Sequence, residues 1–189
     1  LNPGAPQRPV RDGHDDASAL LSCGLYSADN KLPSLAQWLG EEALRGIDDP
    51  AAGHDLQWDI RHAAHLRRLL PHVTDDGLRA LCAGVLNRFD AIAPQFPDWR
   101  WQVVHNDLNP HNVLVGDDRD TLAGIIDFGD MVRTPLVCDL AVACSYQVAS
   151  QPGGDPLARF VTFAAAYHAV LPLTKAERAA LFDLTAARM

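Results

Sequence analysis

Apolar residues recur every three or four positions in two long segments of the chain. Segment 55–70 carries an apolar stripe with arginines on its other faces, which predicts an amphipathic helix. Segment 74–93 keeps the same spacing for about five turns until two prolines interrupt it. An earlier helix is predicted to begin at a capping box formed by Ser34 and Gln37 and to end near Gly46.

The pattern then changes to short β-branched or apolar runs separated by polar loops. Three strands are predicted, WQVV (101–104), VLV (113–115) and AGIIDF (123–128). The turn GDDRD predicts that the last two strands form a hairpin. The loops 105–112 and 127–130 should then lie side by side.

Helix signals return after this β region. We expect Asp139 and Asp155 to cap two helices, and Thr174 with Glu177 to form a capping box for the last one. Residues 1–33 read mostly as a loop or disordered segment, and residues 34–189 as one mainly helical α+β unit.

Composition limits the classes of function. With 48% hydrophobic and 21% charged residues, the chain should fold as a soluble protein. A net charge of -8 argues against nucleic-acid binding and weakly favours a cationic small substrate. Four cysteines without C-x-x-C spacing, and no apolar run long enough for a membrane span, point to reduced thiols and a cytoplasmic location. Because the chain starts at Leu1 and its last helix lacks a stop signal, we expect a fragment, and further domains fused to it in the full-length protein are compatible with this expectation.

Two strings carry the chemistry. HNDLNPHN (105–112) matches H-R-D-L-x-x-x-N except at its arginine, and IIDFGD (125–130) contains D-F-G. Phosphoryl transfer needs a carboxylate near the attacking hydroxyl and oxygen ligands for magnesium. We therefore expect Asp107 to be the catalytic base, and Asn112 and Asp127 to bind Mg²⁺ and through it the nucleotide phosphates. The alternative is a purely structural role, in which these residues only cap turns.

Neighbouring residues are expected to play supporting parts. His105 should pack and hold the loop backbone, and Asp130 should either reach the metal through water or tie down its turn. His111 is left without a role. The pair His62 and His65 shares one helical face but lacks a third ligand, which disfavours a metal site there.

HNDLNPHNVLV, GIIDFGD and PLVCDLA together resemble the aminoglycoside phosphotransferase and choline kinase superfamily, and LQWDIRHA is similar to its hydroxylysine-kinase-like branch. The resemblance covers residues 36–189 and implies the mainly helical C-terminal lobe of a protein-kinase-like fold, with a β-hairpin insert that carries both loops. It implies that Asp139 hydrogen-bonds the catalytic-loop backbone. It also implies an amine-bearing hydroxyl acceptor such as hydroxylysine.

The N-terminal part of the chain lacks sequence features that members of that family carry. No G-x-G-x-x-G precedes the motifs, and neither lysine, Lys31 or Lys175, lies in a V-A-I-K-like strand. We therefore expect the nucleotide lobe to be largely absent and the isolated chain to turn over ATP poorly.

The sequence is compatible with three functions. The first is an ATP- and Mg²⁺-dependent phosphotransferase acting on a small hydroxyl compound. A non-catalytic kinase-like binding module and a metal-dependent phosphohydrolase are the alternatives. The intact Asp107, Asn112 and Asp127 favour the first.

Overall fold

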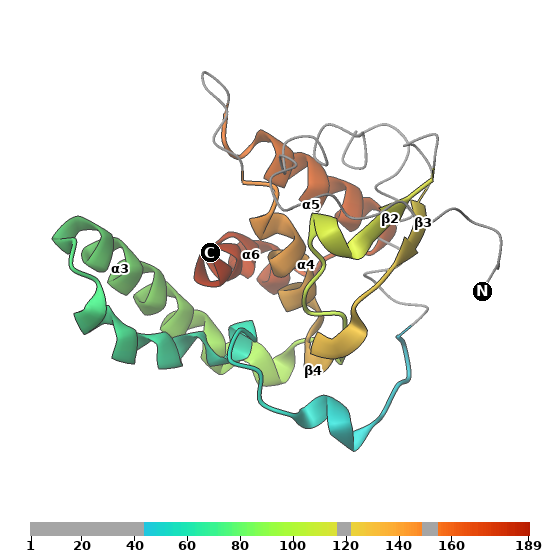
Figure 1. Cartoon of the computed structure of the whole chain (residues 1–189), viewed down its shortest axis with the longest axis horizontal. Coiled ribbons are helices and arrows are strands. Elements are labelled where there is room, and N and C mark those ends of the chain that lie inside the picture. The colour runs from blue at the N-terminus through green and yellow to red at the C-terminus, as the bar shows by residue number, and fades with distance from the viewer. Residues whose placement is uncertain (1–43, 117–121, 149–154) are drawn as a thin grey trace, which may run out of the picture.

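The computed structural model describes residues 44–116, 122–148 and 155–189 (Figure 1). The helix predicted from Ser34 lies almost entirely outside these residues, as does the 33/34 boundary. Gly46, its predicted end, has a φ of 81°, a left-handed conformation that glycine adopts easily.

Helices and four short strands alternate along the described chain. In order they are η1 (Pro50–Gly53), η2 (Ile60–His72), α3 (Asp76–Ile92), η3 (Ala93–Asp98), β1 (Trp101–Val104), η4 (Pro110–Asn112), β2 (Val113–Val115), β3 (Leu122–Ile125), η5 (Phe128–Asp130), β4 (Val132–Pro135), α4 (Leu136–Ser145), α5 (Ala158–Val170) and α6 (Lys175–Arg188). The η elements are 3₁₀ helices.

Helix α4 is the centre of the core. Its residues 136–144 are all buried, and apart from Asp139 they are apolar or small. A helix that is apolar on every side is stable only when other elements surround it. Helices α5 and α6 and strand β1 pack against α4, and α3 packs against α6 and η2 (Figure 1).

The strands form two antiparallel pairs rather than one hairpin insert. Strands β2 and β3 form the predicted hairpin, with Val113 opposite Ile125. Strand β1 pairs with β4, with Val104 opposite Val132. The sequence analysis missed β4, and its third strand was too long because β3 ends at Ile125. The loop β1–β2 and the loop β3–β4 therefore each join one pair to the other.

Three helices begin at residues other than those predicted. The helix expected over 55–70 begins only at Ile60, capped by Asp59, and is a 3₁₀ helix. Asp139 does not cap α4, because the helix already begins at Leu136 after Pro135. Asp155 accepts from the N–H of Leu157 at 2.9 Å, but α5 begins after that turn.

The capping box of α6 is confirmed. The Thr174 hydroxyl accepts from the Glu177 N–H at 3.2 Å, and a Glu177 carboxylate oxygen accepts from the Thr174 N–H at 2.7 Å. Glu177 is buried and also accepts from Arg100 Nε at 2.9 Å. The start of α6 is thus attached to the residue just before β1.

None of the helices in the described ranges combines the length and apolar character that crossing a bilayer demands.

Candidate active site

The loop after β1 is shaped by its own side chains. Asn109 Oδ1 accepts from the backbone N–H groups of His111 at 2.8 Å and Asn112 at 3.2 Å. Pro110 occupies the first position of η4, where a missing N–H costs nothing. This capped turn brings Asn112 back toward Asp107, as the five-residue spacing predicted.

Asp107 and Asn112 are joined directly. Asn112 Nδ2 donates to the backbone oxygen of Asp107 at 2.9 Å and to its Oδ2 at 3.2 Å. Asn109 Nδ2 donates to the same Oδ2 at 2.9 Å. Because the amide nitrogen of Asn112 is turned to Asp107, its amide oxygen faces the opposite side, where it can serve as a ligand for a cation.

The loop after β3 meets the first loop through the backbone. The N–H of Ile126 donates to the carbonyl of Asn112 at 3.0 Å, which extends the β2–β3 ladder by one step. Asp127 follows at once, with φ 63° and ψ 64° and an exposed carboxylate that caps no N–H. The two loops are therefore in contact. Asp127 is the next residue after Ile126, whose N–H donates to Asn112.

His105 also connects the same two loops. The Nε2 atom of its buried ring lies 2.9 Å from the carbonyl oxygen of Ile126, and the ring centroid lies 5.0 Å from that of Phe128. These contacts hold the backbone on both sides of Asp127. They agree with a supporting part for His105.

Asp139 binds the backbone of the catalytic loop. Its Oδ1 accepts from the N–H of Asn106 at 2.8 Å, the contact that the family resemblance implied. Asn106 is fully buried and has a φ of 63°. Burial raises the pKa of Asp139 to about 7; the Asn106 N–H opposes this rise and the charge of Asp107 adds to it.

Asp139 should make stability depend on pH. Because its folded pKa of about 7 lies above its ordinary value of 3.8, the unfolded chain releases the proton first as pH rises. The free energy of unfolding should then fall between these values, by about 1.4 kcal/mol per pH unit for one such group. Asp139→Asn keeps an oxygen for the Asn106 N–H and should remove this contribution.

Urea unfolding of both proteins from pH 4 to pH 7 measures the two slopes. Asp98→Asn, an exposed carboxylate at the end of η3, is the matched control and should keep the slope of the unaltered chain. Equal slopes for the unaltered chain and Asp139→Asn would contradict the assignment.

Asp130 has a partner outside the loops. Its Oδ2 accepts from the indole Nε1 of Trp58 at 3.0 Å, which ties the turn after Asp127 to the segment before η2. The contact favours the tying role among the two that the sequence left open. Trp58 itself was singled out only as part of the LQWDIRHA resemblance.

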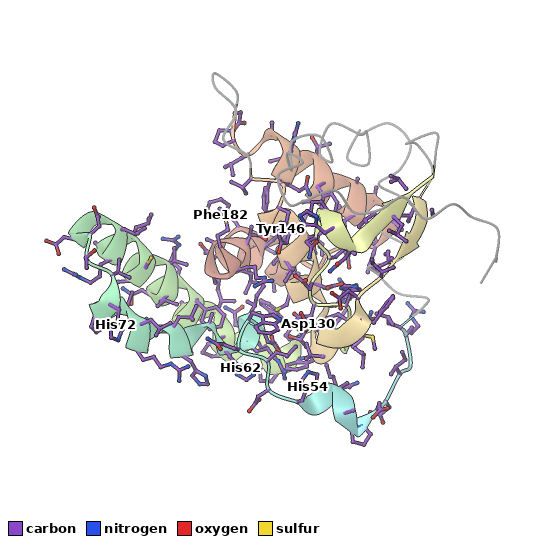
Figure 2. All side chains as sticks on the ribbon, in the orientation of Figure 1. His54, His62, His72, Asp130, Tyr146 and Phe182 are labelled. Atoms are coloured by element: carbon purple, nitrogen blue, oxygen red, sulfur yellow. The ribbon has the colours of Figure 1, made fainter. Side chains whose placement is uncertain are left out.

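Two further residues at Asp107 were not predicted. Arg188, at the end of α6, donates from Nη2 to Asp107 Oδ1 at 3.2 Å. Burial first, and then the negative charge of Asp107, raise the pKa of Tyr146, which caps the end of α4 (Figure 2). Arg188 lies 81 positions from Asp107 in the chain, and no local pattern in the sequence indicates that contact.

The donor set fits magnesium better than a softer metal. Asn112 and Asp127 offer amide and carboxylate oxygens, the ligands that Mg²⁺ prefers. Within residues 44–116, 122–148 and 155–189, no three His, Cys, Asp or Glu side chains gather into a metal site. His62 and His65 stack with ring centroids 5.5 Å apart, and His111 is exposed.

Comparisons with known proteins agree with the motifs. The sequence model of the "Phosphotransferase enzyme family" matches residues 19–174. The chain is 32% identical over 122 residues to hydroxylysine kinase of Danio rerio, covering 62% of this chain and 34% of that protein. It is 31% identical over 170 residues to homoserine kinase of Methylobacillus glycogenes, covering 86% and 51%. The chain thus spans a third to a half of the length of these curated relatives.

A solved structure shows the same fold. An aminoglycoside-3'-phosphotransferase of type VIII superposes with a TM-score of 0.51 at 21% identity, over 97% of this chain and 66% of that one. The expected loss of the nucleotide lobe stays a prediction, since residues 1–43 lie outside the described structure. The sequence resemblance itself is confirmed, including the hydroxylysine-kinase-like branch. The chain belongs to the phosphotransferase enzyme family that includes aminoglycoside phosphotransferase-like small-molecule kinases.

Proposed function

We propose that this chain forms the catalytic part of an ATP- and Mg²⁺-dependent kinase that phosphorylates the hydroxyl group of a small, amine-bearing compound. The observation that carries the proposal is the hydrogen-bonded junction of the two loops. Asn112 donates to Asp107 through its side chain and accepts from Ile126 through its backbone. A base candidate and two candidate oxygen ligands therefore lie on two loops that are hydrogen-bonded to each other.

Each residue has a chemical task in this proposal. Asp107 would accept a hydrogen bond from the acceptor hydroxyl and orient it. It would take the hydroxyl proton as the new oxygen–phosphorus bond forms and the bond from the γ-phosphorus to its bridging oxygen breaks, so that ADP leaves with that oxygen. Asn112 and Asp127 would hold the magnesium ion, which supplies charge neutralisation to the phosphates when it is bound. Asp139 and His105 would keep the backbone of both loops in place through the Asn106 N–H and the Ile126 carbonyl.

The acceptor class is supported by the relatives and by charge. The names of the matched proteins are hydroxylysine kinase, homoserine kinase and an aminoglycoside phosphotransferase, all of which denote small hydroxyl acceptors that also carry amines. A net charge of -8 weakly favours an amine-bearing acceptor of this kind. We extend this acceptor class to the present chain as part of the proposal.

The test is a transfer assay on the protein that contains this segment. ATP, Mg²⁺ and a panel of amino alcohols, hydroxy amino acids and aminoglycosides are supplied, and mass spectrometry follows the phosphorylated acceptor. We expect product with at least one acceptor, loss of product in excess EDTA, and recovery on adding Mg²⁺. Release of phosphate at the same rate without any acceptor would instead indicate a phosphohydrolase, and no turnover with any acceptor would favour the non-catalytic module.

A further inference from the structure

Arg188 brings a positive charge to the residue expected to act as base. Its Nη2 lies 3.2 Å from Asp107 Oδ1, and the two side chains are 18% and 21% exposed. Helix α6 is thereby attached at both ends to residues that flank β1, through Glu177 to Arg100 before the strand and through Arg188 to Asp107 after it. The position of the guanidinium is therefore fixed relative to the loop.

The hydrogen-bonding capacity of Arg188 is only partly used. A guanidinium carries five N–H donors in a planar fork. Asp107 takes one of them, the Tyr146 side chain is a second hydrogen-bond partner, and the buried Nε of Arg188 has no acceptor in the described part of the chain. Buried donors are normally satisfied, so such a group marks a place where a further acceptor belongs.

Arg188 also lines a pocket of about 230 Å³ beside the site. The other lining residues come from the segment before η2, from η2 itself and from α6: Gln57, Trp58, Asp59, Ile60, Ala63, Leu66 and Ala187. Arg188 is the one cationic side chain among them. Asp59, the one acidic member, already accepts from Arg61 Nε at 2.7 Å and from the Arg61 N–H at 2.9 Å.

The pocket therefore combines a small volume, walls that are partly apolar and partly polar, and one guanidinium whose Nε has no acceptor. Such a fork matches the geometry of a carboxylate, which it can bind through two parallel hydrogen bonds. A hydroxyl group that reaches Asp107 and a carboxylate that reaches Arg188 would be close enough to belong to one small molecule, because the two side chains touch. Compounds that carry only amines offer nothing to the guanidinium.

We propose that Arg188 is the specificity-determining residue of the acceptor site, and that the acceptor is a hydroxy amino acid whose carboxylate Arg188 binds. The inference rests on the proposed function, since it places the acceptor at Asp107. It narrows the acceptor class by excluding amino alcohols and aminoglycosides as preferred ligands.

Binding tests the inference without relying on catalysis. Calorimetric titration of the full chain compares L-homoserine with 3-aminopropan-1-ol, which is the same molecule without the carboxylate. We expect homoserine to bind about 10- to 100-fold more tightly, the value of a charge-assisted pair. 5-Hydroxylysine and 1,5-diaminopentan-2-ol form a second matched pair of larger size.

Substitution of the arginine should remove this preference. Arg188→Met keeps the length of the side chain but has no donors, so the two members of each pair should bind with similar affinity. Arg188→Lys keeps the charge and should retain part of the preference, and it replaces the Met variant if the latter does not fold. Arg178→Met, at an exposed arginine about 15 Å earlier along α6, is the matched control and should bind like the unaltered chain.

The outcomes separate the inference from the proposed function. Equal affinity for both members of each pair, or an unchanged preference in Arg188→Met, would overturn the inference even if phosphate transfer to amino alcohols is observed. A preference that depends on Arg188 supports the inference. If the protein then transfers phosphate to neither compound, the proposed function is what fails.

Discussion

Asp107→Asn is expected to lower the phosphotransfer rate by about 10²- to 10⁴-fold, the usual contribution of a positioned general base. Asparagine keeps the shape of the side chain and an oxygen for the amide donors of Asn109 and Asn112. It cannot accept a proton from the acceptor hydroxyl. The loss should therefore fall on kcat, measured by initial rates at saturating ATP, Mg²⁺ and acceptor.

A matched control separates chemistry from the loss of an ion pair. Asp183 accepts from Arg88 Nε at 2.7 Å on α6, so Asp183→Asn also breaks an aspartate–arginine pair of the same kind. Exposed pairs contribute at most about 1 kcal/mol to stability, and this variant should keep its full rate. A comparable fall in both variants would show that Asp107 acts only through the fold.

Asp127→Asn is expected to lower the rate by at least about 10²-fold and to raise the Mg²⁺ concentration needed for half-maximal activity. A bound metal supplies several kcal/mol of charge stabilisation in the transition state, and each 1.36 kcal/mol changes the rate tenfold. Asparagine tolerates the left-handed backbone of Asp127, so the loop should keep its shape.

Rates at increasing Mg²⁺ measure this effect. Asp130→Asn is the control variant. Asp130 accepts a hydrogen bond from the Trp58 indole, and an asparagine oxygen can still accept it. If Asp130 only ties down its turn, that variant should keep its dependence on Mg²⁺. An unchanged Mg²⁺ response in Asp127→Asn would remove Asp127 from the metal site.

Features that depend on short stretches of sequence were predicted well. The capping box of Thr174 and Glu177 needs only four residues, and the β2–β3 hairpin only a turn between two apolar runs. The HNDLNPHN string likewise predicted the turn from Asp107 to Asn112, since Asn109 and Pro110 shape it locally. In these places the local chemistry determines the local structure.

Features that depend on distant partners were missed. Strand β4 is four residues long and ends in proline, and it is a strand because β1 pairs with it from across the catalytic loop. Asp139 looked like a cap because an aspartate often begins a helix, but the apolar residues before it already belong to the buried helix α4. Arg188 reaches Asp107 only after α6 has packed against the core.

Both loops turn at a residue with a φ of 63°, Asn106 in one and Asp127 in the other. Only glycine, asparagine and aspartate adopt this conformation readily. In a library of random variants, position 106 should therefore accept a short set of amino acids, as long as its N–H still reaches Asp139. The residue at position 127 needs both a left-handed backbone conformation and a carboxylate group. Glycine lacks the carboxylate, and glutamate does not adopt this backbone conformation readily. Aspartate alone combines the two properties, so position 127 should show narrower variation than position 106.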